Sequence, residues 1–401
     1  MRPDNVFATR SKARRAGLIG AIAGLAAAGV AAGVATERHL INKARNDPND
    51  PYRDEPFGRL GADTTTTVTT PDGVDLHVET VTTRATGGPE AVEPEATVVF
   101  VHGYCLDMGT FHFQRRALAD SDIPVRAVYY DQPGHGRSGP LPAPVYGLDE
   151  LADALRAVIE RTAPTGPVIL AGHSMGAMTI MVFARRHPDL FTERVAGVSL
   201  LSTSGGGLDK VTFGAPRALT QARRLFLPLL SRAASLTPNA IDRIRRIAGD
   251  LAWVLTRRYG FATPKPSPAL VSYVEHMNTA TPIRTVIGFS LALLEHDERE
   301  KLASLGQVPT LICVGNEDQF TPAEHSTLLS ELLPHASLVV IPHAGHVALL
   351  ENPHAVSRPL LAALTDITTA LAADRPDRRP DNRGRPRRWR RDRRTKREDG
   401  N

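Results

Sequence analysis

The chain has 401 residues, of which 42% are hydrophobic and 23% charged, and its formal net charge is +5 at pH 7. The basic excess lies at the two ends: residues 1–45 contain eight Lys or Arg and two acids, and residues 374–401 contain thirteen and six. The stretch between them is net negative, which argues against a generally basic, nucleic-acid-binding body. With only two cysteines, Cys105 and Cys313, the chain has neither a disulfide framework nor a C-x-x-C metal motif.

Residues 16–36 form an uncharged run directly after four basic residues between positions 10 and 15. About 20 apolar residues are needed to cross the hydrocarbon core of a membrane. Three interpretations are open: an uncleaved anchor, a cleaved export signal, or a soluble Ala-rich helix. We favour the anchor, so residues 1–36 are predicted to be a basic N-terminus plus a membrane segment. The basic flank predicts an extracytoplasmic catalytic body, the alternatives being an exported protein or a cytoplasmic, peripheral one.

After residues 37–60, a predicted linker rich in Asn, Asp and Pro, residues 61–373 have the pattern of one catalytic domain. A β-branched run, a Pro-Asp-Gly turn and an alternating stretch predict an opening hairpin. Several buried strands follow. Between some of them, at 148–161 and 177–186, apolar residues at helical spacing predict helices. Those strands are predicted at 97–101, 125–130, 168–171, 195–201, 310–314 and 337–341. Continuous apolar strands alternating with helices predict an α/β fold, with a mostly parallel sheet flanked by helices on both faces.

The alternation breaks at about 205–300, where the stretches 215–234 and 239–256 have apolar residues at helical spacing. We predict a helical lid here, inserted before the last two strands. From Lys210 to Gly260 there are ten basic and two acidic residues. Two interpretations of this charge are open: a surface that draws acyl chains from an anionic interface, or solvated helix faces whose leucines pack on the body.

The C-terminal residues 374–401 are rich in Arg, Pro and Asp and cannot form a core. They are predicted to be a disordered basic tail. Its role is either to keep the chain soluble or to bind an anionic lipid or polymer.

A nucleophile is indicated by the stretch Gly172-His173-Ser174-Met175-Gly176, which follows one predicted strand and precedes a predicted helix. A sharp strand-to-helix turn raises the serine hydroxyl above the sheet edge, and close packing there requires glycine two residues to each side. The N-terminus of the helix favours developing negative charge. We therefore predict that Ser174 is a nucleophile, the alternative being a glycine-rich turn with an incidental serine.

A serine hydroxyl needs a base, and the base needs an orienting acid; the order expected for this architecture is Ser, acid, His. The loops after the last two predicted strands offer Glu317 or Asp318, and His343 or His346. We favour Asp318 over Glu317, because a side chain one position earlier in the loop points in a different direction. We favour His346 because Gly345 precedes it and a helical pattern follows.

An oxyanion hole needs two backbone N–H donors aimed at the developing charge. Met175, directly after the nucleophile, is predicted to supply one, and Tyr104, in the loop after the strand 97–101, the other. His102 would brace this loop without transferring protons. Seven of the histidines outside the predicted triad are expected to be structural or exposed: His102, His112, His173, His187, His276, His296 and His325.

Features spanning about 97–352 together resemble the lipase/esterase-type branch of the α/β-hydrolase fold superfamily. They are His102-Gly103, the stretch Asp131-Gln132-Pro133-Gly134-His135-Gly136-Arg137-Ser138, the serine motif at 172–176, Asp318 and Gly345-His346. The resemblance implies the fold and a Ser-His-Asp triad, with the stretch 131–138 as a structural loop. Family members include lipases, esterases, thioesterases, peptidases, C–C bond hydrolases and cofactor-free haloperoxidases. The resemblance therefore specifies the catalytic residues more closely than it specifies the substrate.

We expect a serine hydrolase that cleaves carboxylic esters through an acyl-enzyme, acting on lipid-like, monoacylglycerol-type substrates. The expected partners are a small-molecule or lipid ester and a membrane, with no metal, organic cofactor or nucleic acid; no oligomeric state is predicted. A thioesterase or C–C bond hydrolase on the same triad is the alternative. A catalytically silent, ligand-binding member is disfavoured because all three triad positions are filled.

Overall fold

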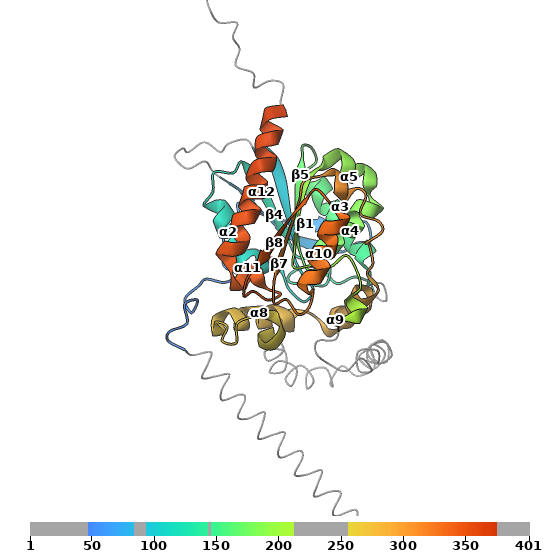
Figure 1. The fold of residues 1–401 in the computed structure, drawn as a ribbon. Coiled ribbons are helices and arrows are strands. Elements are labelled where there is room, and N and C mark those ends of the chain that lie inside the picture. Colours follow the sequence, from blue (N-terminus) through green and yellow to red (C-terminus); the bar gives the residue numbers. More distant parts are fainter. Residues whose placement is uncertain (1–46, 84–93, 143–145, 212–255, 375–401) are drawn as a thin grey trace, which may run out of the picture.

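The computed structural model describes residues 47–83, 94–142, 146–211 and 256–374. Its framework is one eight-stranded sheet in the order β1-β2-β4-β3-β5-β6-β7-β8 (Figure 1). The strands are β1 (Thr64–Thr69), β2 (Asp75–Thr82), β3 (Ala96–Val101), β4 (Val125–Tyr130), β5 (Val168–His173), β6 (Val195–Leu201), β7 (Thr310–Gly315) and β8 (Ala336–Ile341). Only the pairs β1–β2 and β2–β4 are antiparallel, so the mostly parallel sheet predicted from the sequence is confirmed.

Helices connect the strands and cover the sheet. The longer ones are α2 (His112–Ala119), α3 (Leu148–Thr162), α4 (Met175–Arg186), α5 (Pro188–Arg194), α8 (Pro268–Ala280), α9 (Ile283–Glu295), α10 (Ala323–Leu332) and α12 (Pro353–Asp374). Short turns of helix are η1 (Met108–Phe111), η2 (Leu208–Lys210), η3 (Thr256–Gly260), η4 (Leu305–Gln307) and α11 (Ala348–Glu351).

Both faces of the sheet are buried, as the continuous apolar strands require. Side chains alternate between faces along each strand. In β3, Val99 and Val101 belong to one apolar core, together with residues of α3, α4 and α10. Val98 and Phe100 belong to the other, together with residues of α2, α8 and α12. Figure 1 shows α3, α4 and α10 on one side of the sheet and α2 and α12 on the other.

The described part of the segment between β6 and β7 contains helices joined by loops, and α8 and α9 lie across one end of the sheet (Figure 1). Its position before the last two strands is as predicted. The helix predicted over 215–234 lies outside the described residues, as do nearly all of the one over 239–256, the uncharged run 16–36 and the tail after Asp374. Within the described ranges, none of the helices combines the length and the apolar composition needed to cross a membrane.

Part of the predicted linker packs on the body. The Asp50 carboxylate accepts hydrogen bonds from Ser267 Oγ (2.6 Å) and the Ala269 N–H (2.7 Å) at the start of α8. The Phe57 ring stacks on Tyr273 of α8, with 4.4 Å between ring centroids. Contacts with the body therefore begin before the predicted boundary at residue 61. Phe57, an aromatic residue in a polar stretch, is the sequence signal for this packing.

The turn from β5 into α4 is packed backbone against backbone. A β-carbon on Gly172 would lie 2.5 Å from the Ala177 nitrogen, and one on Gly176 would overlap the carbonyl oxygen of Val101 in β3. Between them, Ser174 has a φ of +52° and a ψ of −117°, a conformation that non-glycine residues rarely adopt. Glycine is required at both positions because no side chain fits between the helix and the sheet.

Gly176→Ala is expected to lower the free energy of unfolding by about 1–3 kcal/mol, the usual cost of forcing an extra carbon into packed structure. Gly306→Ala is the control, because a β-carbon there meets nothing within 4 Å; its effect should stay within about 0.5 kcal/mol. Urea denaturation of both variants measures the difference. Equal stabilities would contradict the close approach of α4 to β3.

Candidate active site

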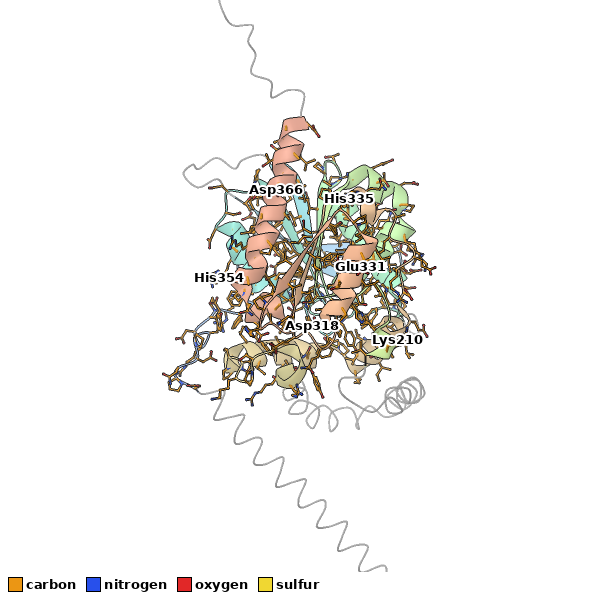
Figure 2. The ribbon with its side chains drawn as sticks, viewed as in Figure 1. Lys210, Asp318, Glu331, His335, His354 and Asp366 are labelled. Carbon is orange, nitrogen blue, oxygen red and sulfur yellow. The ribbon has the colours of Figure 1, made fainter. Side chains whose placement is uncertain are left out.

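Three predicted site residues lie at one edge of the sheet, in the loops that follow parallel strands. Ser174 follows β5, Asp318 follows β7 and His346 follows β8. The carboxyl ends of parallel strands meet at one edge, which is where open α/β sheets place their sites. Figure 2 shows Asp318 at the end of the sheet that faces α8.

The structure joins these three side chains by hydrogen bonds. Ser174 Oγ lies 3.0 Å from His346 Nε2. On the other side of the imidazole, Nδ1 lies 2.9 Å from Asp318 Oδ2 and 3.1 Å from Oδ1. With Nδ1–H donating to the carboxylate, Nε2 is left as the acceptor for the serine proton. The arrangement can therefore deprotonate the hydroxyl as it attacks.

Asp318 is fully buried but has enough partners to stay ionised. Its carboxylate accepts hydrogen bonds from the Phe320 N–H (2.9 Å), the Thr321 N–H (2.9 Å) and the Thr321 hydroxyl (2.8 Å). Burial alone raises the pKa of Asp318, but His346 and the Thr321 donors outweigh it, so the pKa lies below its usual value. A negative charge is thus held next to His346 Nδ1.

The two alternative site residues lie elsewhere. His343 Nδ1 is 3.4 Å from Glu317 Oε1, and the two side chains are 90% and 47% exposed. They form a surface pair and do not take part in the hydrogen-bond chain to Ser174. The structure thus places Asp318 and His346, the favoured residues, beside the serine.

The backbone of Ser174 is fixed from both sides. Its N–H donates to the Leu201 carbonyl at the end of β6 (2.9 Å), and its carbonyl accepts from the Thr203 hydroxyl (2.9 Å). Such bonds are needed because a positive φ at a non-glycine residue costs free energy, of order 1–3 kcal/mol. Met175, a predicted oxyanion donor, is the first residue of α4, where backbone N–H groups are not used within the helix.

The loop after β3 lies against the serine. A β-carbon on Gly103 would be 3.2 Å from Ser174 Cβ. Buried His102 braces this loop: its Nε2 accepts the Gln132 N–H (2.8 Å), so Nδ1 carries the proton donated to the Gly103 carbonyl (2.8 Å). Burial lowers the pKa of His102 to about 4, so the ring is neutral. His102 thus has the bracing position predicted for it.

Tyr104, the second predicted oxyanion residue, lies in the same loop. Its side chain reaches α9, where the hydroxyl donates to the Val286 carbonyl (2.5 Å) and lies 2.8 Å from Ser290 Oγ. The next residue, Cys105, has a φ of +56°. The loop after β3 therefore contacts the insertion through the Tyr104 hydroxyl and the serine turn through Gly103.

Two further residues support the site, of which the sequence suggested only His173, as a structural or exposed histidine. His173 Nε2 lies 3.0 Å from the His346 carbonyl, and the two rings have centroids 5.1 Å apart. Burial, and then the charge of His346, lower the pKa of His173 to about 3, so its Nε2–H donates as a neutral imidazole. Thr321 was the other. Its position three residues after Asp318, where a hydroxyl can return to the carboxylate, was the available signal.

The stretch 131–138 has the structural role that the resemblance implied. The buried Asp131 carboxylate accepts the N–H groups of Met108 and Arg137, each at 2.9 Å. The Ser138 hydroxyl donates to the Asp131 carbonyl (2.6 Å) and accepts the His77 N–H (2.9 Å). These bonds fix the loop after β4.

Comparison with known proteins identifies the family of the chain. The family model described as alpha/beta hydrolase fold matches residues 96–353. The acetyltransferase component of the acetoin cleaving system of Pseudomonas putida is 29% identical over 270 residues, which cover 67% of this chain and 63% of that protein. A monoacylglycerol lipase of Mycolicibacterium smegmatis is 31% identical over 106 residues, 26% of this chain and 37% of the lipase.

Among solved structures, a thermophilic esterase from Thermogutta terrifontis superposes with a TM-score of 0.58 at 24% identity, covering 76% of this chain and 99% of the esterase. This likeness shows the fold. The chain spans less than two thirds of the length of the two curated relatives named above. The family model, in contrast, covers more than half of the chain and every residue of the hydrogen-bonded site. The chain therefore belongs to the alpha/beta hydrolase fold family.

Proposed function

We propose that this chain is a serine hydrolase that cleaves carboxylic esters of lipid-like alcohols or acids through an acyl-enzyme. The observation that carries the proposal is the continuous hydrogen-bond chain from Ser174 Oγ through the His346 imidazole to the Asp318 carboxylate. Nucleophile, base and orienting acid in this order are what acyl transfer by a serine requires.

In the proposed reaction, Ser174 Oγ attacks the acyl carbonyl carbon while its proton passes to His346 Nε2. The Met175 and Tyr104 amides hold the oxygen as it gains negative charge. His346 then gives the proton to the leaving alcohol as the C–O bond breaks, which leaves the acyl group on Ser174. A water molecule deprotonated by His346 releases the acid and restores the hydroxyl. Throughout, Asp318 stabilises the charged imidazole.

A lipid-like substrate is supported by two observations. One relative is a monoacylglycerol lipase, although the match covers 37% of its length. The insertion before β7 is also rich in basic and apolar residues between 210 and 260, a composition suited to an interface with anionic lipid. Thioesterase or C–C bond hydrolysis on the same residues is separated from this proposal by assay.

Ser174→Ala is expected to abolish labelling of the purified protein by a fluorophosphonate probe, because the probe bonds covalently to an activated serine oxygen. Hydrolysis of ester substrates should fall by at least about 10³-fold, the scale of losing a nucleophile of this kind. Gel fluorescence measures the labelling, and esters of increasing acyl chain length, alongside a thioester, measure the specificity.

Labelling that persists in the Ser174→Ala variant would overturn the assignment of the nucleophile. Activity confined to very short acyl groups would remove the lipid-like substrate and keep the esterase. Preference for the thioester would favour the alternative reaction.

Asp318→Asn is expected to lower ester turnover about 10³-fold or more, because the carboxylate no longer holds the imidazole in its productive orientation. Its effect on stability depends on pH. The pKa of Asp318 is lower in the folded state than the unfolded value of about 3.9, so the carboxylate stabilises the fold above that pH and loses this effect as the pH falls through the folded-state pKa. The difference in unfolding free energy between wild type and variant should shrink below about pH 4. A difference that grows on acidification would contradict this.

We also propose that residues 16–36 hold the chain at a membrane with the catalytic domain on the extracytoplasmic side. The described chain begins at residue 47, and Asp50 is bonded to the start of α8, at the end of the sheet that carries Ser174. The eleven peptide bonds from Thr36 to Asp47 can span at most about 40 Å. Such an anchor would hold the site end of the domain near the lipid surface.

Protease treatment of intact cells tests this orientation. A protein tagged after residue 401 should lose the tag when protease is added outside the cytoplasmic membrane. A tag cleaved only after lysis would contradict the extracytoplasmic placement, and recovery of the protein in the soluble fraction would contradict the anchor.

A further inference from the structure

The carboxylate of Glu351 joins two segments that are far apart in the sequence. Glu351 is the last residue of α11, five residues after His346. Its Oε2 accepts the Gly345 N–H (2.7 Å), directly before the histidine. Its Oε1 accepts the N–H groups of Ala262 (3.0 Å) and Thr263 (2.9 Å), in the stretch 260–263 that leads into α8. The Ala262 N–H also lies 3.1 Å from Oε2. One side chain thus connects the histidine loop to the insertion.

Close packing reinforces this connection. A β-carbon on Gly345 would lie 2.7 Å from the Gly260 carbonyl oxygen and 2.8 Å from the Ala262 nitrogen. On the other side of the histidine, the Val347 N–H donates to the same Gly260 carbonyl (3.1 Å). The residues before and after His346 are therefore both held on the stretch 260–263.

The contacts of His346 itself do not include the residue before it. Its ring is hydrogen-bonded to Asp318 and Ser174, and its carbonyl accepts from His173. Gly345 is held separately, through the N–H that Glu351 accepts. Without that acceptor, the histidine loop loses a charge-assisted hydrogen bond at the residue next to the base.

We infer that Glu351 is a positioning residue for the hydrolysis, which fixes His346 against Ser174 by bonding the histidine loop to residues 262–263 of the insertion. The inference rests on the proposed function. It also gives the insertion a part in setting the base, because the stretch that leads into α8 serves as the platform for the histidine loop.

Glu351→Gln tests this with little change in volume. A carboxylate accepts hydrogen bonds at both oxygens, whereas an amide accepts at one end and donates at the other. If the amide oxygen faces Ala262 and Thr263, the NH2 group faces the Gly345 N–H, donor against donor. The reverse orientation places the NH2 group against the Thr263 N–H and leaves Ala262 only its 3.1 Å bond to the remaining oxygen. In either orientation an NH2 group faces a backbone N–H, and the link between the two segments loses at least one hydrogen bond.

The full chain is measured as wild type, Glu351→Gln, Glu351→Ala and Glu331→Gln. Glu331, an exposed residue of α10 labelled in Figure 2, is the matched control for loss of one carboxylate. Active serines are counted with a fluorophosphonate, and kcat per active serine, KM and the labelling rate are determined on a short-chain ester. Misplacement of a catalytic group by about 1 Å can cost about 10²-fold in rate. We expect kcat and the labelling rate of Glu351→Gln to fall about 10–100-fold, KM to stay within about 3-fold, and Glu331→Gln to match wild type.

Wild-type kcat per active serine in Glu351→Gln would overturn the inference, whatever its melting temperature, because it would leave the residue a structural role alone. A loss confined to KM would overturn it as well. If Glu351→Ala does not fold, the Gln variant decides. Failure of the proposed function is separate from these outcomes, since wild-type protein would then show no Ser174-dependent labelling.

Discussion

The site depends on how closely helix α4 approaches strand β3. Only because Gly176 has no side chain can the helix begin against the Val101 carbonyl. That contact fixes the turn in which Ser174 takes its positive φ, and with it the direction of the hydroxyl and the start of the helix. The loop that carries Gly103 follows β3 directly, so the same contact sets its distance from the serine.

Within this frame, electrostatics gives the site one buried negative charge among neutral rings. Burial lowers the pKa of His102 to about 4 and that of His173 to about 3, so both stay uncharged. Asp318 stays ionised because the donors of Thr321 and His346 outweigh its burial. The field of the carboxylate therefore acts on His346 without competition from a neighbouring imidazolium.

The sequence was sufficient to predict the strands and the loops that carry Ser174, Asp318 and His346, because each follows a continuous apolar run whose end is visible in the residues. It could not predict contacts made at long range. The packing of Phe57 on α8 and the bonds of Glu351 to the insertion join segments more than 80 residues apart. The spacing of apolar residues along the chain gives no indication of such long-range contacts. The contact of Thr321 with Asp318 could have been predicted, since the two residues are three positions apart. A single threonine in a loop can make many other contacts, however, so its position alone did not identify it.

The ties between the insertion and the site have a consequence for exchanging parts between relatives. The Tyr104 hydroxyl bonds to α9, and Glu351 bonds to the stretch that leads into α8. The groups that these two side chains contact lie within residues 256–300. The stretch 212–255 can therefore be swapped with every one of these bonds left in place. A chimera that takes the whole insertion, about 205–300, also replaces the platform of the histidine loop. Junctions at residues 211 and 256 thus separate exchange of this stretch from disturbance of the catalytic frame.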